Sequence, residues 1–201
     1  MLFTLPGYDV HEYLVVLQPH EEVQTKITQV KKIFAEEFLN EHALYSRPHI
    51  ALVRFKQLAM QEEKIISRLK NIAMGLAPVK IELSDYGSFP AHTIYINVKT
   101  KLPVQYIVKK IRTDAQRLMK LDADNKPHFL IDPYIPIARK LVPWQYEKAW
   151  EKYAHKNFTG RFIADGILVL RRKEGEKNYQ VLRRLTFDNL PVNTTQASLF
   201  S

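Results

Sequence analysis

One histidine, His49, stands at the start of a predicted strand, where its side chain could take part in acid-base catalysis. His49 lies in the stretch RPHIALVRF, residues 47–55, at the start of a short apolar run that predicts a β-strand. With simple alternation along that strand, His49 shares a face with Ala51 and Val53. An imidazole titrates near neutral pH and can therefore accept or donate a proton in catalysis. A lone histidine is more often packed or hydrogen-bonded in a structural role, so a second observation has to decide.

That second observation is a repeat of the same pattern. Residues 132–141 read DPYIPIARKL, another short apolar stretch, although its two prolines each remove a backbone donor from a predicted strand. The aligned pairs are Pro48 with Pro133, His49 with Tyr134, Ile50 with Ile135, Ala51 with Pro136, Leu52 with Ile137 and Arg54 with Arg139. Two such halves predict two lobes related by a pseudo-twofold axis, with residues 49 and 134 facing each other across a cleft.

Hydrophobic periodicity predicts the elements that position these stretches. Strands are expected at residues 13–19, 49–55, 79–89, 93–99, 128–139, 162–172 and 179–187. Helices with one apolar face are expected at residues 21–39, 61–76, 102–121 and 143–154. Because several strands follow one another without a helix, neighbours should pair antiparallel. The predicted fold class is α+β, with two lobes of antiparallel sheet and flanking helices around a central cleft, in one bilobal domain over residues 1–187.

Composition limits the classes of partner and compartment. The 201-residue chain carries 30 Lys and Arg against 21 Asp and Glu, a formal net charge of +9, which favours phosphate-bearing partners. It has no cysteine, so disulfides and thiolate metal sites are excluded. The sequence shows neither a signal-peptide pattern nor the run of about 20 apolar residues that a membrane helix needs. We expect a soluble, cytoplasmic, monomeric protein that binds RNA or a nucleotide.

The stretches RPHIAL and DPYIPI resemble the repeated motif of the two-histidine (2H) phosphoesterase superfamily, which includes 2′-5′ RNA ligase-like proteins and cyclic nucleotide phosphodiesterases. In that family each lobe carries His-x-Thr/Ser-x, and the resemblance extends over roughly residues 10–187. It implies that one histidine acts as a general base on a 2′-hydroxyl or water and the other as a general acid on the leaving oxygen. It also implies that the two hydroxyls bind the phosphate and that neither a metal nor another cofactor is needed.

This chain keeps only the first histidine of the family pattern. His49 is present, but Ala51 and Pro136 stand where the hydroxyls belong, and Tyr134 replaces the second histidine. A tyrosine with an ordinary pKa near 10 is a poor base at neutral pH but can donate a hydrogen bond to a phosphate oxygen. We therefore expect catalytic activity that is weak or absent, and the sequence leaves open whether the protein is an enzyme.

Three further residues belong to the predicted site. His128, in KPHFLI at residues 126–131, is an alternative second histidine if the second lobe is aligned six residues earlier. The Tyr134 alignment is preferred because it reproduces the spacing from the motif to the arginine. Arg54 and Arg139, five residues beyond the motif positions, are predicted with Tyr134 to bind phosphate, although arginines at strand ends also commonly point into solvent.

The C-terminal residues 188–201 are polar and lack periodicity, which predicts a flexible tail. Their end, QASLF, resembles the peptide by which bacterial replication proteins dock on the sliding clamp, with Gln196, Leu199 and Phe200 as the contacting residues. The alternative is a tail without a partner, or one that packs on its own domain. Two functions are thus open: a protein that acts on or binds RNA ends or cyclic nucleotides, and a catalytically silent nucleic-acid-binding adaptor.

Overall fold

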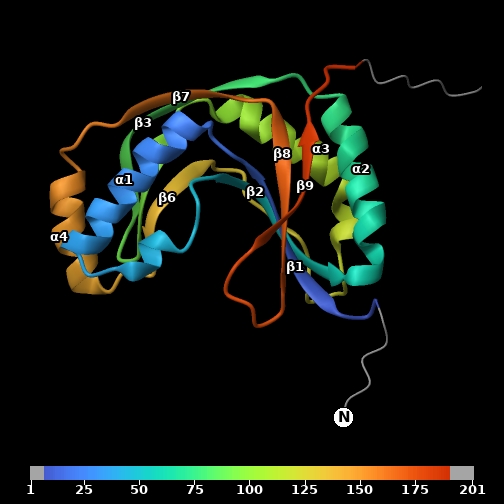
Figure 1. Ribbon diagram of the computed structural model, residues 1–201, viewed down its shortest axis with the longest axis horizontal. Coiled ribbons are helices and arrows are strands. Elements are labelled where there is room, and N and C mark those ends of the chain that lie inside the picture. Colours follow the sequence, from blue (N-terminus) through green and yellow to red (C-terminus); the bar gives the residue numbers. More distant parts are fainter. Residues whose placement is uncertain (1–6, 191–201) are drawn as a thin grey trace, which may run out of the picture.

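The computed structural model describes residues 7–190 of the chain (Figure 1). Its strands are β1 (Val10–Leu17), β2 (Ile50–Leu58), β3 (Val79–Phe89), β4 (Thr93–Val98), β5 (His128–Phe129), β6 (Tyr134–Arg139), β7 (Thr159–Ala164), β8 (Gly166–Lys173) and β9 (Gln180–Thr186). The helices are α1 (Glu21–Glu37), α2 (Glu62–Met74), α3 (Lys101–Met119) and α4 (Pro143–Tyr153), with short 3₁₀ helices η1 (Glu41–Leu44) and η2 (Ala59–Gln61). All four predicted helices are therefore present.

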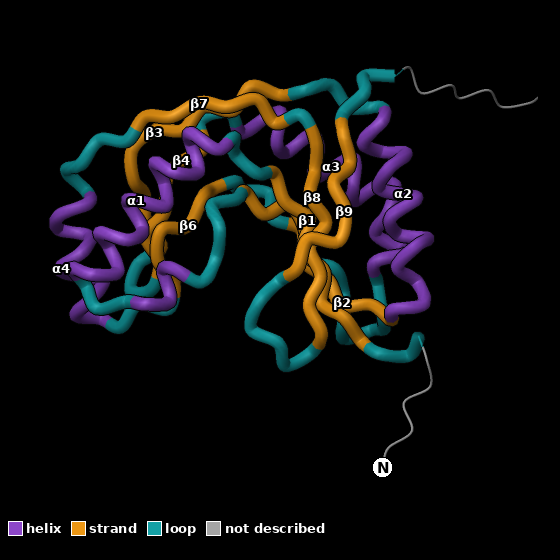
Figure 2. Tube along the Cα trace, viewed as in Figure 1, coloured by secondary structure: helices purple, strands orange, loops and turns teal. Residues whose placement is uncertain are grey.

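The strands form two antiparallel sheets, as Figure 2 shows in orange. One sheet has five strands in the order β5-β2-β1-β8-β9, and the other has four in the order β6-β4-β3-β7. Each pair of neighbouring strands is antiparallel. The predicted α+β class, with two lobes built on antiparallel sheets, is confirmed.

Helices α1 and α3 connect the two lobes, because each packs on a sheet that does not contain at least one of its flanking strands. Helix α1 connects two strands of the five-stranded sheet but packs with α4 against the four-stranded sheet. Helix α3 runs from β4 of the four-stranded sheet to β5 of the five-stranded sheet and packs with α2 against β2 and β9 (Figure 1). Buried side chains from both sheets belong to one apolar cluster. Burial of this shared cluster stabilises the relative position of the lobes.

Local sequence explains where the helices form. The buried residues of α1 include Val23, Ile27 and Phe34, whose spacing of four and seven places them on one helix face. The first turn of α1 carries Glu21 and Glu22, which interact favourably with the positive end of the helix dipole. Helix α4 begins at Pro143, where a missing backbone donor costs little because that donor would be unsatisfied in any helix.

Two predicted strands are each divided between the two sheets. The segment 162–172 contains the end of β7, which pairs with β3, and most of β8, which pairs with β1 and β9. The break falls between Ala164 and Gly166, where a Cβ on Gly166 would lie 2.5 Å from the Leu185 carbonyl oxygen. The segment 128–139 contains β5, which pairs with β2, and β6, which pairs with β4. A single continuous strand is wrong in both cases, because the chain crosses from one lobe to the other.

The end of the described chain lies against the second helix. The backbone amides of Asn189 and Leu190 donate hydrogen bonds to the carbonyl oxygens of Leu76 and Met74, at 3.0 and 2.8 Å. Gln196, Leu199 and Phe200 of the predicted clamp-binding peptide lie outside the described residues. Within residues 7–190, no helix combines the length and apolar character needed to cross a bilayer.

Candidate active site

The retained histidine, His49, lies immediately before β2, and a backbone carbonyl two residues earlier in the chain orients its ring. The Nδ1 atom of His49 lies 2.7 Å from the carbonyl oxygen of Arg47. Because a carbonyl oxygen only accepts hydrogen bonds, this contact requires the proton on Nδ1 and leaves Nε2 of the neutral ring as a hydrogen-bond acceptor. In this tautomer His49 has the form that a general base needs.

The surroundings of His49 keep its ring neutral. The pKa of His49 is lowered to about 4, chiefly by burial and also by the positive charges of Arg139 and Lys31, while the hydrogen bond to the Arg47 carbonyl acts in the opposite direction. At neutral pH the imidazole is therefore uncharged. It is also a weaker base than an ordinary histidine, since its conjugate acid loses the proton more readily.

A bulge changes which residues share the face of His49. On β1 the consecutive residues Val15 and Val16 are opposite Val53 and Ala51, so Leu52 of β2 is the extra residue. Both Leu52 and Val53 are fully buried, whereas Ala51 and Arg54 line the cleft described below. The expectation that Val53 shares the histidine's face is wrong, because the bulge breaks the period of two and brings Arg54 to that face instead.

The same irregularity occurs in the second copy of the pattern. On β4 the consecutive residues Ile94 and Tyr95 are opposite Ala138 and Pro136, so Ile137 of β6 is the extra residue. Ile137 is the residue that aligns with Leu52. Tyr134 and Arg139 therefore both line the cleft, in the same relation as His49 and Arg54. The repeat seen in the sequence extends to a repeated bulge.

The position of β6 explains how a strand carries two prolines. It is the outermost strand of the four-stranded sheet and pairs only with β4. A proline is tolerated in an edge strand because one side of that strand has no partner that requires its missing amide. Proline at position 136 thus preserves the strand while removing the hydroxyl that the family pattern places there.

Aromatic rings surround the tyrosine that replaces the second histidine. The ring of Tyr134 lies 5.1 Å from that of Phe89 and 4.9 Å from that of Tyr95, between centroids. The guanidinium of Arg139 lies 5.8 Å from the centroid of the Tyr134 ring, within the range of a cation–π contact. These contacts orient Tyr134 at the cleft. The hydroxyl is the one hydrogen-bonding group that a tyrosine side chain offers there.

His128 occupies a different place from Tyr134. It belongs to β5 and is opposite Arg54 in β2, so it lies in the same sheet as His49. Tyr134 begins β6 in the other sheet. His128 also lines the cleft and is exposed. By its place in the topology, Tyr134 therefore corresponds to His49. His128 is a neighbour of Arg54, on the side of the cleft that the five-stranded sheet forms.

The five predicted site residues line one cleft of about 1090 Å³ between the concave side of the five-stranded sheet and a wall of α1, η1 and β6. Its cations are Lys31, Arg47, Arg54, Arg139, Arg172 and Lys177. Among the described residues that line this cleft, none is Asp or Glu. Such a cavity attracts anions, because in the part of the chain that the structure describes Arg54 and Arg172 share one carboxylate, Glu12, and the other four cations of the lining pair with none. Elsewhere in residues 7–190, no three His, Asp or Glu side chains converge as they would around a metal ion.

Lys31 lines the cleft although it was not among the predicted site residues, and it is only 2% exposed although it is charged. Its Nζ donates hydrogen bonds to the carbonyl oxygen and, at 3.2 Å, to the hydroxyl of Ser46. A signal was available: Lys31 follows Ile27 by four residues and precedes Phe34 by three, on the apolar face of α1. Its apolar neighbour Val30 is only partly buried.

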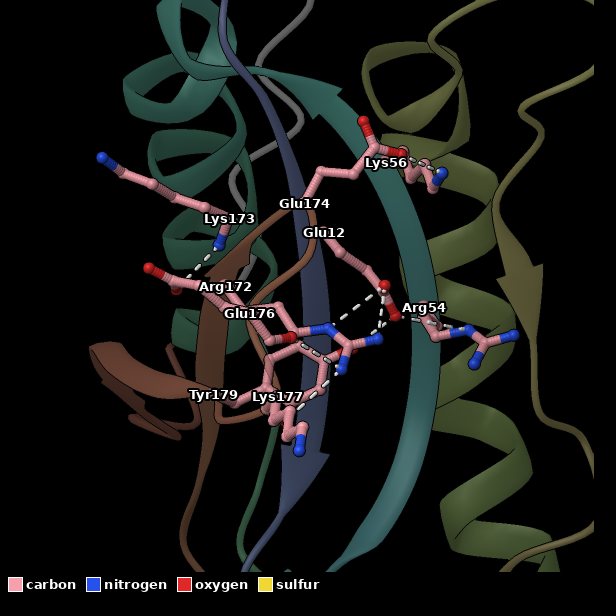
Figure 3. A network of polar contacts seen from close by, with 9 residues as sticks. All are labelled: Glu12, Arg54, Lys56, Arg172, Lys173, Glu174, Glu176, Lys177 and Tyr179. Carbon is pink, nitrogen blue, oxygen red and sulfur yellow. Dashed lines mark hydrogen bonds and ion pairs between the residues drawn. The ribbon is translucent and has the colours of Figure 1, made fainter.

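A second group of residues missed from the sequence organises the opposite wall of the cleft (Figure 3). Glu12 of β1 accepts hydrogen bonds from the guanidinium of Arg172, at 2.7 Å, and from the hydroxyl of Tyr179, at 2.5 Å. Arg54 lies 3.8 Å from the same carboxylate. Burial acts to raise the pKa of Glu12, but the hydrogen bonds from Tyr179 and Arg172 together hold it below its ordinary value. Glu12 thus keeps its charge and fixes two cleft arginines.

Comparison with known proteins places the chain among phosphoesterases. A family model described as the 2′-5′ RNA ligase superfamily matches residues 19–176, whereas a comparison with curated proteins gave no match. The protein TT0787 of Thermus thermophilus is similar with a TM-score of 0.60 and 14% identity, over 88% of this chain and 98% of that one. E. coli LigT complexed with 3′-AMP is similar with a TM-score of 0.59 and 12% identity, over 89% and 98%. E. coli LigT complexed with NADP+ gives 0.58 and 14%, over 90% and 99%.

Identities this low show the fold of these proteins, and the family model, which spans more than half of the chain, shows the family. The two observations agree with the repeated motif frame of β2 and β6 and with the cleft that lies between them. The chain belongs to the 2′-5′ RNA ligase superfamily of two-histidine phosphoesterases.

Proposed function

We propose that the cleft binds the phosphate of a nucleotide or of an RNA end and that the protein has little or no phosphodiesterase or ligase activity. The observation that carries this proposal is the lining of the cleft, which contains six Lys and Arg and, among the described residues, no Asp or Glu. A lining of this kind attracts a phosphate by long-range electrostatics and binds it by charge-assisted hydrogen bonds. E. coli LigT, which has the same fold, has been crystallised with 3′-AMP, NADP+ and ATP.

The expected weakness of catalysis follows from which proton transfers the cleft can support. The neutral ring of His49 has a free Nε2 to accept the proton of an attacking water or 2′-hydroxyl. When that oxygen attacks phosphorus, the bond to the leaving oxygen breaks and the leaving oxygen needs a proton. Tyr134 can donate a hydrogen bond there, but a phenol hydroxyl is in general a far weaker acid than an imidazolium. Loss of the general acid alone reduces a rate by about 10² to 10⁴.

The proposal is tested by separate measurements of binding and turnover. Binding of 3′-AMP is measured by calorimetry, and turnover is measured with 2′,3′-cyclic nucleotides and 2′-5′-linked dinucleotides, in the wild type and in His49→Ala. We expect binding of 3′-AMP, with turnover that is slow or absent and that disappears in His49→Ala. Turnover at the same rate in His49→Ala would remove His49 as the base, and absence of any binding would remove the ligand class.

A second function is favoured by the number of motif positions that have changed. Three of the four chemical positions differ from the family pattern, at Ala51, Tyr134 and Pro136. We propose as the alternative a catalytically silent adaptor that holds nucleic acid in the cleft and docks on a sliding clamp through Gln196, Leu199 and Phe200. The peptide of residues 193–201 is titrated into a purified bacterial clamp, with a Leu199→Ala, Phe200→Ala peptide as control. No binding at high micromolar concentration ends the adaptor proposal.

Both functions assume the same organisation of the chain. We propose that residues 1–187 act as one bilobal domain, as a monomer in the cytoplasm, and that residues 188–201 form a tail available to a partner. The absence of cysteine from the sequence permits a reducing compartment, and its net charge of +9 favours partners such as nucleotides and RNA. Light scattering of the full chain measures the monomer mass directly.

A further inference from the structure

Lys31 is a buried cation that pairs with no carboxylate of residues 7–190. Its side chain projects from α1 and is 2% exposed, and its two hydrogen bonds go to the carbonyl oxygen and the hydroxyl of Ser46. In the described part of the chain it forms no ion pair with Asp or Glu. An ammonium group has three N–H donors, so one donor is left after both contacts to Ser46. A buried charge held only by neutral acceptors is unfavourable for stability, which raises the question of what it binds.

The lysine lies where an anion can reach it. It lines the same cleft as His49 and Arg139, and α1 packs directly against β6, from which Arg139 projects. Among the residues that the structure describes, Arg139 likewise forms no ion pair with Asp or Glu. The two cations therefore repel each other across the cleft wall, unlike Arg54 and Arg172 on the other wall, which share Glu12. An anion between Lys31 and Arg139 would convert this repulsion into two attractions.

We propose that Lys31, oriented by Ser46, is the phosphate-binding residue of the cleft and supplies the donor that the motif hydroxyls provide elsewhere in the family. The inference rests on the proposed function, because it assigns the phosphate of that ligand to one side chain. Ala51 and Pro136 offer no side-chain donor, so a phosphate next to His49 needs another one. The remaining N–H of Lys31 can donate this hydrogen bond to the phosphate. It comes from helix α1, whereas the motif hydroxyls would come from β2 and β6.

The protonation of Lys31 makes the assignment measurable. Burial, together with the positive charge of Arg139, lowers the pKa of Lys31 to about 8. The groups that face it are Arg139 from β6 and His49 at the start of β2, and His49 stays neutral at this pH. A bound dianion favours the charged lysine and raises its pKa, so binding above pH 8 draws a proton from solution.

The experiment is calorimetric titration of 3′-AMP into the full chain at pH 8.5, in two buffers with different enthalpies of ionisation. The phosphate of 3′-AMP is already a dianion at this pH, since its second pKa is near 6, and a cationic site lowers that pKa, so the ligand does not take up the proton. We expect proton uptake by the wild-type protein. Binding without proton uptake overturns the assignment of Lys31 while leaving the proposed function intact, whereas no binding overturns both.

Matched variants give the second readout. In Lys31→Met we expect binding of 3′-AMP to be about 10- to 100-fold weaker, without proton uptake, because a charge-assisted hydrogen bond is lost. Lys32→Met changes the charge equally on the exposed side of the same helix and should bind as the wild type does. Lys31→Arg keeps the charge but does not titrate near pH 8, so it should bind without proton uptake even if the methionine variant folds poorly. Unchanged affinity and unchanged proton uptake in a folded Lys31→Met refute the assignment.

Discussion

His49 and Arg54 line the same cleft although they are five positions apart, a spacing that places two residues on opposite faces of a regular strand. The extra residue Leu52 restores them to one face. Tyr134 and Arg139 have the same relation around the extra residue Ile137. Each lobe therefore presents one motif residue and one arginine to the cleft. This geometry suggests how the lost chemistry can be restored.

Restoring the motif residues should restore catalysis. The double variant Ala51→Thr, Tyr134→His reinstates one hydroxyl and the second imidazole on faces that already line the cleft. We expect hydrolysis of 2′,3′-cyclic nucleotides to rise by about 10² over the wild type, because a general acid becomes available. Rates are measured by chromatography of the products. The same double variant with His49→Ala is the control and should lose the gain. A folded double variant without any gain shows that position 134 does not reach the leaving oxygen.

The neutral state of His49 predicts a dependence of stability on pH. Because the pKa of His49 is lowered to about 4, the unfolded chain binds more protons at this residue than the folded chain between about pH 4 and 6.5. Stability should therefore fall as the pH falls through this window, by an amount on the order of 1–3 kcal/mol. Urea unfolding of His49→Ala should show a smaller fall than the wild type. His155→Ala, at an exposed position, is the control and should follow the wild type. Equal curves for all three proteins contradict the burial of an uncharged His49.

Lys31 should reduce stability while it serves binding. Its lowered pKa means that the unfolded chain binds more protons at this residue than the folded chain between about pH 8 and 10.5, so wild-type stability rises with pH there. Lys31→Met removes the buried charge and should raise the Tm at pH 7 by about 2–4 °C, on the order of 1 kcal/mol. The gain should shrink toward pH 10 as the wild-type lysine becomes neutral. Thermal unfolding monitored by circular dichroism checks this, with Lys32→Met as control. A lower Tm for Lys31→Met shows that the bonds to Ser46 contribute more than the charge costs.

Glu12 should have the opposite effect to Lys31. Glu12→Gln removes the charge that holds Arg172 and pairs with Arg54, and it weakens the hydrogen bond from Tyr179 (Figure 3). We expect a loss of about 1–3 kcal/mol in urea unfolding, because the partly buried Arg172 loses its partner, whereas the exposed Arg54 contributes little. Affinity for 3′-AMP should rise at low salt and depend more steeply on salt, since the cleft becomes more positive. Glu174→Gln, which breaks an exposed pair with Lys56, should change stability by less than about 0.5 kcal/mol. Equal effects of the two substitutions refute the special role of Glu12.

Much of the fold was open to prediction because it depends on local patterns. Helix 143–154 begins with a proline that suits the first turn, and helix 21–39 shows the spacing of its apolar face, so both are found nearly as predicted. The repeat of Pro48 to Arg54 in Pro133 to Arg139 is visible in the letters alone. It was sufficient to predict two related lobes and a shared cleft, because a repeated sequence pattern favours a repeated structure.

Other features depend on pairings between distant parts of the chain. The break at Asp165 separates two strands of different sheets. The Asp165-Gly166 pair is a local signal for a break, but it does not say that the two strands join different sheets. The bulges at Leu52 and Ile137 are defined by their partners on β1 and β4, so alternation along one strand alone puts Val53 on the wrong face. Such features require the register of the partner strand, which the residues of one strand do not contain.

The division of information is clearest at the cleft. By itself, the sequence determined which chemical groups are available: one motif histidine, a tyrosine in place of the second, no motif hydroxyl, and an excess of cations. Only the tertiary structure decided where those groups act. Helix α1 connects two strands of the five-stranded sheet but packs on the four-stranded sheet, and this packing places Lys31 in the wall of the cleft. That a lysine lies on the apolar face of a helix can be predicted from the local sequence. Its approach to Arg139 and His49, and the charge it therefore places beside a bound anion, arise from packing between lobes.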